Sequence, residues 1–170
     1  MTDRLHNDGA LVQFSERLTN SQAFGNLFRE GMDLVEETAA YLDGVGRTEA
    51  RALERAVSLT YATESMRLTT RLMQLASWLL LHRAVKEGEM TLTQANREKT
   101  KVKLSAADPG PVEMIEKLPA QLQDLIERSM SLQSRVRRLD TTIHAPQAER
   151  VAIGNPLVPQ LNRLKAAFEQ

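Results

Sequence analysis

The chain has 170 residues, with 22 Lys and Arg against 22 Asp and Glu, and it contains no Cys. A chain of this length can bury the core of one domain, while zero net charge gives no general attraction to nucleic acid or anionic membranes. The lack of Cys excludes disulfides, thiolate zinc sites and cysteine nucleophiles. Aromatic residues make up 4% of the chain, which is low for a base-stacking surface.

The N-terminal residues are polar and lack the apolar run of a signal sequence, which favours a cytoplasmic protein with a flexible arm at 1–18. Thr19 and Gln22 have capping-box spacing and predict the start of a helix. Helical apolar spacing follows up to a turn at 43–46, where Gly44 is expected in the left-handed conformation. So short a turn predicts that the next helix returns antiparallel to the first.

The longest predicted element is one helix over 48–87, a stretch with neither Pro nor Gly. Its apolar residues form two stripes. The first contains Leu53, Val57, Tyr61, Leu68, Leu72, Leu75 and Leu79. The second contains Leu59, Ala62, Met66, Met73, Ala76 and Leu80. Because consecutive residues are about 100° apart around a helix, the two stripes face different partners. We expect this helix to be the centre of a bundle, and its second half, which is apolar on more than one side, to suit self-association. The sequence leaves open whether a dimer uses this helix or the one predicted over 118–143.

Shorter elements follow the long helix. Gly88 is expected to end it, and Thr91 with Gln94 repeats the capping-box spacing at the start of a helix over 92–104. The Pro-Gly-Pro segment at 109–111 then interrupts the chain.

A last helix is predicted over 118–143, with Pro119 in its first turn or at a kink. Its apolar residues are spaced four and three apart, with Ser129 alone out of pattern, which is typical of coiled-coil-like packing. They are Leu118, Leu122, Leu125, Leu132, Val136, Leu139 and Ile143. Residues 144–170 lose this spacing and are expected to form a mobile tail. The fold prediction is all-α: an antiparallel three-helix bundle within 19–143, with one very long central helix, an additional short helix and flexible termini.

Polar residues inside the long helix form one candidate site. Glu64, Arg67 and Arg71 share a face at spacings of three and four residues. One interpretation is a functional polar site within the bundle. The favoured interpretation is a structural ion pair that fixes how two helices are aligned.

Two basic clusters, at 97–103 and 135–138, are interpreted first as solvated helix faces and second as contacts for an acidic protein partner. The candidate partner-binding residues of the first cluster are Arg97, Lys99, Lys101 and Lys103.

The remaining motifs give no sign of catalysis. His6, His82 and His144 do not lie at metal-ligand spacing, so no metal site is expected. Glycine-rich phosphate loops and nucleophile motifs are missing from the sequence. We therefore expect neither a cofactor nor an enzymatic activity.

Several segments together resemble one known family. AYLDGVGR at 40–47 and YATESMRLTTRLMQLASWLLLHRAVKEGEMT at 61–91 are similar to the alphaproteobacterial regulators of CtrA degradation, the RcdA-like proteins, and so is FGNLFREGMDLVEETA at 24–39. The resemblance covers about 21–103 and extends more loosely to Ile143. A segment such as ESMRLTTRLMQLASW is too long for amphipathicity alone to explain the likeness.

The resemblance implies a small helical-bundle protein that forms a homodimer and acts, without catalysis, as an adaptor of the ClpXP protease. Such an adaptor joins a protease primed by the response regulator CpdR and helps to deliver cell-cycle regulators, including CtrA through a cyclic-di-GMP-binding partner. Recruitment to a cell pole belongs to the same expectation. We also hypothesise that the C-terminal tail docks on a partner through a short apolar motif. Its residues are Leu157, Val158, Leu161, Leu164 and Phe168.

Two other classes of function are weighed against this one. A nucleic-acid-associated regulator would use the basic clusters at 97–103 and 135–138, but zero net charge and the lack of an evident recognition helix disfavour it. A helical-bundle enzyme would need a buried polar cluster, which the sequence does not indicate.

Overall fold

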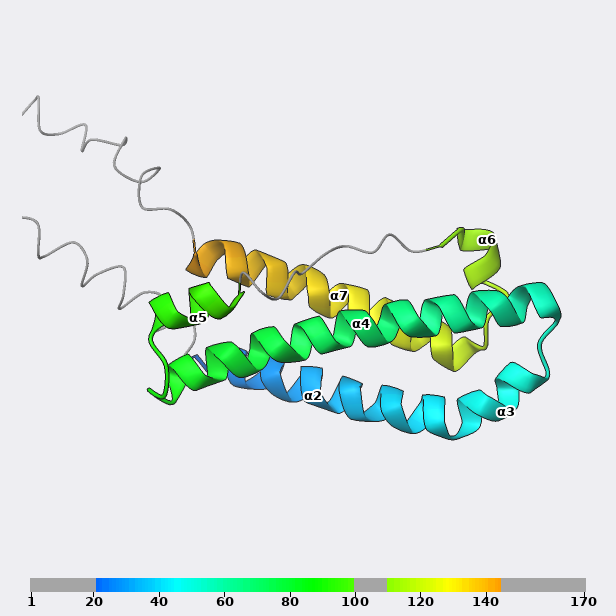
Figure 1. Cartoon of the computed structure of the whole chain (residues 1–170), viewed down its shortest axis with the longest axis horizontal. Coiled ribbons are helices and arrows are strands. Elements are labelled where there is room, and N and C mark those ends of the chain that lie inside the picture. Colours follow the sequence, from blue (N-terminus) through cyan, green and yellow to red (C-terminus); the bar gives the residue numbers. More distant parts are fainter. Residues whose placement is uncertain (1–20, 100–109, 145–170) are drawn as a thin grey trace, which may run out of the picture.

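The structure, a computed structural model, describes residues 21–99 and 110–144, and the regular elements in these ranges are helices. Three long helices pack side by side: α2 (Gln22–Asp43), α4 (Arg55–Lys86) and α7 (Ala120–Ile143) (Figure 1). The predicted all-α bundle around a long central helix is confirmed. In the described ranges no helix is both long enough and apolar enough to span a membrane.

The three long helices do not all alternate in direction. Helix α2 runs antiparallel to α4 and α7, whereas α4 and α7 run in the same direction (Figure 1). Arg71 of α4 contacts Ser129 of α7, and Trp78, further along α4, contacts Asp140, further along α7. The antiparallel prediction is therefore right for α2 and wrong for α4 against α7.

Two short helices lie at opposite ends of α4. Helix α5 (Leu92–Lys99) lies near its C-terminal end, and α6 (Val112–Ile115) lies near its N-terminal part (Figure 1). The sequence predicted a helix from 92 but did not predict α6.

Helix boundaries follow local capping chemistry. Helix α2 begins after Ser21, whose hydroxyl accepts a hydrogen bond from the Phe24 N–H at 3.3 Å. The start predicted at Thr19 is thus two residues early, and Thr19 itself lies outside the described residues. At α5 the predicted capping box is confirmed, because Thr91 and Gln94 each accept a hydrogen bond from the other's backbone N–H, at 3.2 and 2.9 Å.

The chain reverses later than the sequence predicts. Gly44 has a φ of −112° rather than a left-handed one, and a further helix, α3 (Val45–Arg51), follows it directly. Gly46 lets α3 approach the bundle, since a Cβ there would lie 2.6 Å from the Tyr61 hydroxyl. The Tyr41 hydroxyl donates to Glu49 at 2.7 Å and holds α3 against the end of α2.

The long helix is consequently shorter than predicted. The backbone is extended at Glu54 (ψ 153°), and α4 starts at Arg55 and has 32 residues, so the prediction of one helix over 48–87 is wrong at its beginning. The half-buried Leu53 packs against the core at this reversal, a tertiary contact that outweighs the local preference for helix. The predicted end is confirmed, because Gly88 closes α4 with a φ of 76°.

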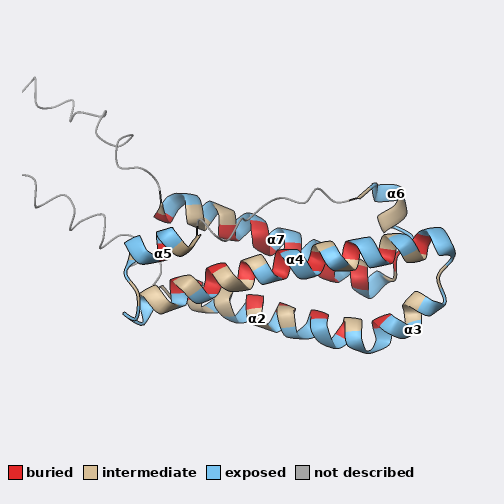
Figure 2. Cartoon of the chain, in the orientation of Figure 1, coloured by how far each residue is buried: buried red, intermediate tan, exposed pale blue. Residues whose placement is uncertain are grey.

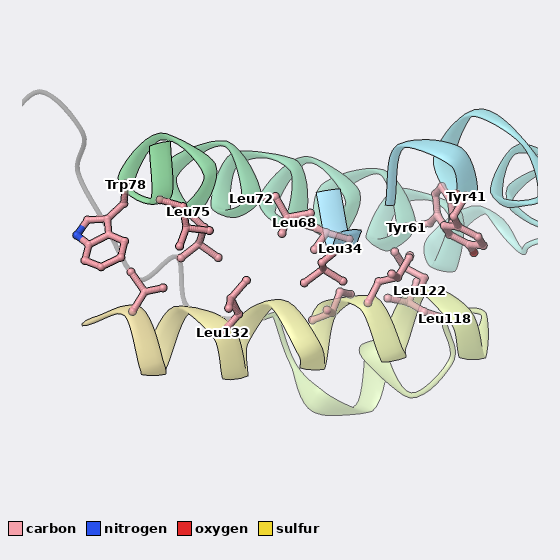
Figure 3. Packing of buried hydrophobic residues seen from close by; sticks show 14 of the residues in the cluster. Leu34, Tyr41, Tyr61, Leu68, Leu72, Leu75, Trp78, Leu118, Leu122 and Leu132 are labelled. Carbon is pink, nitrogen blue, oxygen red and sulfur yellow. The ribbon is translucent and has the colours of Figure 1, made fainter. Parts of the chain in front are cut away.

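The core lies along the inner face of α4 (Figures 2 and 3). Trp78 and Leu79 are fully buried, and Leu34 of α2 is 1% exposed. The predicted apolar face of the last helix is also confirmed. Its fully buried members are Leu122, Leu125, Leu132 and Val136. Pro119 does not kink this helix but stands at its N-cap, before the first turn.

Candidate partner interface and polar clusters

The second apolar stripe of α4 lies open on the surface. Its four large side chains, Leu59, Met66, Met73 and Leu80, are 71%, 72%, 67% and 52% exposed. They recur every seven residues, the interval of a coiled-coil seam, and the described helices do not cover them. Scattered apolar residues are normal on a protein surface, but an aligned row along one helix is typical of an interaction site.

Three hydroxyls of this surface are already hydrogen-bonded within the helix. The hydroxyls of Thr63, Thr69 and Ser77 donate to the backbone carbonyl four residues earlier, at 3.0, 2.8 and 2.8 Å. A partner could therefore cover these hydroxyls without leaving them unpaired, which removes the main energetic penalty of burying polar groups. The stripe between Leu59 and Leu80 also carries no charged side chain, since Ala62 and Ala76 fill its intermediate positions.

A shallow groove borders the stripe between α4 and α2. It has a volume of about 180 Å³. It is lined by Val35, Thr38, Ala39, Leu42, Thr69, Leu72, Met73 and Ala76. The buried Thr38 hydroxyl has no hydrogen-bond partner among the described residues. Stripe and groove together form a surface that can receive the side chains of an apposed helix.

A buried polar cluster lies on the other side of α4. Glu64 is 2% exposed, and it accepts hydrogen bonds from Arg67 at 2.5 Å and from the Gly110 N–H at 3.2 Å. Arg71, which is 3% exposed, donates to the hydroxyl of Ser129 on α7 at 2.8 Å. Burial lowers the pKa of Arg71, and the nearby charge of Glu64 opposes that shift. The cluster thus joins α4 to α7 and to the segment before α6.

Comparison with known proteins gives a matching family and a similar crystal structure. The family described as a protein of unknown function, DUF1465, matches residues 15–168. The crystal structure of RcdA from Caulobacter crescentus CB15 is similar to this chain, with 48% sequence identity and a TM-score of 0.64. The match covers 78% of this chain and 99% of that one. The chain belongs to the RcdA-like family. No curated protein sequence matches it.

In this RcdA-like chain the predicted basic cluster is only partly described. Arg97 is exposed near the end of α5, whereas Lys99 is half-buried and its ammonium lies 2.6 Å from Asp140 on α7. Lys101 and Lys103 lie outside the described residues, as do the tail residues Leu157, Val158, Leu161, Leu164 and Phe168. Arg135 and Arg138 of the second cluster are exposed, and Arg135 pairs with Glu30 of α2.

The structure brings two histidines of this RcdA-like chain together. His144, which the sequence places in a tail, is the C-cap of α7, and its Nε2 lies 3.2 Å from Nε2 of His82. Sequence spacing could not indicate this pair, because its members are separated by 62 residues and are brought together by tertiary packing. His6 lies outside the described residues.

Sequence reasoning also missed the partners of the buried charges. Ser129 accepts a hydrogen bond from Arg71, and Asp140 forms an ion pair with Lys99. Neither Ser129 nor Asp140 was predicted as a site residue. The sequence did carry a signal for Ser129, because this residue alone interrupts the apolar spacing of α7. In the structure Ser129 is fully buried. The sequence carries no comparable signal for Asp140.

Proposed function

We propose that this protein is a non-enzymatic adaptor that helps to deliver cell-cycle regulators such as CtrA to the ClpXP protease, together with a response-regulator partner. Membership of the RcdA-like family, with 48% identity over nearly all of the Caulobacter RcdA chain, carries the proposal. The three packed helices supply a rigid body, and the stripe on α4 supplies a surface for another protein chain.

We assign the stripe to self-association. Its large residues follow the order Leu, Met, Met, Leu, which reads the same in both directions along α4. A two-fold axis crossing the helix between Thr69 and Thr70 would place Leu59 of one copy opposite Leu80 of the other. Such self-complementarity is what a two-fold symmetric interface requires. The acidic partners and the tail docking motif remain predictions from the sequence.

The dimer is tested by replacing Met66 and Met73 together with Lys. Placing charges on an apolar contact in both copies should weaken dimerisation by at least about 100-fold while leaving the helical content unchanged. Sedimentation velocity measures this change. Val112→Lys is the matched control, because Val112 is 68% exposed but lies on α6, away from the stripe.

The position of the axis has a sharper test, since the chain contains no Cys. Thr70→Cys should form a disulfide between two copies under mild oxidation, whereas Thr142→Cys, an exposed position on α7, should not. Equal cross-linking of both variants, or a monomeric wild type, would overturn the assignment of the stripe.

The adaptor role is tested by reconstituted degradation. Adding the full chain to ClpXP, the response regulator and CtrA with its cyclic-di-GMP-binding partner should accelerate loss of CtrA, and an inactive ClpP trap should recover the chain with the protease. Salt-sensitive DNA binding at micromolar concentration without any effect on degradation would instead support the nucleic-acid-associated class.

A further inference from the structure

A second, independent site lies at the end of the bundle where α4, α5 and α7 meet. The ligand atoms of His82, Asp140 and His144 all lie within 4.8 Å of one another. His82 is fully buried, and Asp140 and His144 have side chains that are 14% and 9% exposed. We propose that these three residues bind one divalent transition-metal ion, with Zn²⁺ as the best-fitting example.

The buried His82 is oriented as a metal ligand. Its Nδ1 lies 2.9 Å from the carbonyl oxygen of Trp78, and its ring stacks on the Trp78 indole with centroids 3.9 Å apart. Because a carbonyl can only accept, Nδ1 carries the proton, and the neutral ring presents its lone pair at Nε2. Burial supports this neutral form by lowering the pKa of His82 to about 4. Metal-binding histidines are commonly fixed by such a hydrogen bond from the second nitrogen.

The second nitrogen ligand already stands at a suitable distance. Nε2 of His144 lies 3.2 Å from Nε2 of His82, with the two rings edge to face. Two nitrogens bound to tetrahedral zinc at about 2.0–2.1 Å are separated by roughly 3.4 Å. The pair can therefore share one metal ion with little movement, and each ring keeps the other aimed at the same point.

Asp140 completes a set of two imidazoles and one carboxylate. Its Oδ1 lies 3.6 Å from Nε2 of His144 and accepts a hydrogen bond from the Trp78 indole N–H at 2.8 Å. Trp78 thus orients two of the three ligands, through its carbonyl and through its indole. Imidazole with carboxylate suits Zn²⁺ and its transition-metal neighbours, whereas Mg²⁺ and Ca²⁺ prefer oxygen ligands alone.

One neighbouring charge opposes metal binding. The ammonium of Lys99 lies 2.6 Å from Oδ2 of Asp140 and neutralises the carboxylate. An arriving cation must share Asp140 with this ammonium or displace it. The affinity of the site is accordingly set by competition with Lys99, and removing that charge should strengthen metal binding.

The test uses the full chain without a histidine tag and Zn²⁺ as the probe. Competition with a chromophoric chelator should give one Zn²⁺ per chain, and Co²⁺ should give the visible absorption of a tetrahedral site. At a hundredfold excess over the dissociation constant, Zn²⁺ should raise the melting temperature by about 5 °C or more.

Variants decide whether these residues form the site. His144→Gln and Asp140→Asn should each weaken zinc binding by at least about tenfold. His6→Gln, the matched change at the third histidine of the chain, should leave it unchanged. Lys99→Gln should tighten it. Both His144 and Asp140 are near the surface, so their variants remain informative even if His82→Gln does not fold. No binding by the wild type, or equal binding by His144→Gln and Asp140→Asn, would overturn the proposal.

Discussion

Removing the charge of Glu64 tests how much this carboxylate contributes to stability by compensating the buried positive charge of the polar cluster. Glu64→Gln keeps the shape of the side chain but leaves the buried guanidinium of Arg71 without its neighbouring negative charge. Removing one charge from a buried ionic cluster typically costs about 3–5 kcal/mol. The lower end of this range applies here, because the direct ion-pair partner of Glu64 is the half-exposed Arg67, and Arg71 keeps its hydrogen bond to Ser129. We therefore expect a loss of about 3 kcal/mol in the free energy of unfolding.

Urea denaturation followed by circular dichroism measures this loss. With a slope of about 2 kcal/mol per molar urea, the midpoint should fall by about 1.5 M. Glu37→Gln is the matched control, because Glu37 also pairs with an arginine, Arg128, but both side chains are 42% exposed. The control should cost less than about 1 kcal/mol. Arg71→Met, which removes the buried cation itself, should cost less than Glu64→Gln. Equal losses for Glu64→Gln and Glu37→Gln would refute this account of the cluster.

Two further predictions concern close packing and buried tyrosines. A Cβ at Gly31 would lie 2.4 Å from Cδ1 of Leu79, so Gly31→Ala should destabilise the protein by about 1–3 kcal/mol. Gly25→Ala, in the same helix but with open space around it, should stabilise the protein by up to about 1 kcal/mol, and reversed effects in thermal unfolding would contradict the packing. Burial raises the pKa of Tyr41 and Tyr61 above the usual 10.0. The unfolded chain therefore releases phenolic protons first, and the stability that is complete below pH 10 is lost as the pH rises above it. Tyrosinate absorbance should appear together with the loss of helical circular dichroism, and ionisation near pH 10 with intact helices would argue against buried phenols.

Much of the fold could be predicted because its signals are local. The spacing of α7, the capping box at Thr91 and the glycine that closes α4 each act over a few residues, and each holds in the structure. The break at Glu54 could not be predicted in this way. The sequence around it favours helix, and the reversal depends on where Leu53 meets the core and on the close approach at Gly46.

The candidate sites also differ in whether they lie within one helix or are assembled from several. The stripe of α4 could be found from its period, since all its members belong to one helix. The groove beside it needs α2 as a second wall. The pair of His82 and His144 depends on α4 and α7 running in the same direction, which hydrophobic spacing does not specify. Sequence spacing therefore reveals sites within one element and misses those assembled from several.

The surface ion pairs between α2 and α7 have a consequence of their own. Glu30 pairs with Arg135, and Glu37 with Arg128, so the acids and the bases are each one heptad apart on antiparallel helices. If α7 slid by a heptad in one direction, Arg128 would meet Glu30 while Arg135 faced Ala23; in the other direction, Arg135 would meet Glu37 and Arg128 would pass the end of α2. After either slip, one Arg–Glu pair forms instead of two. Each contact adds little stability, yet together they select the one register that satisfies both.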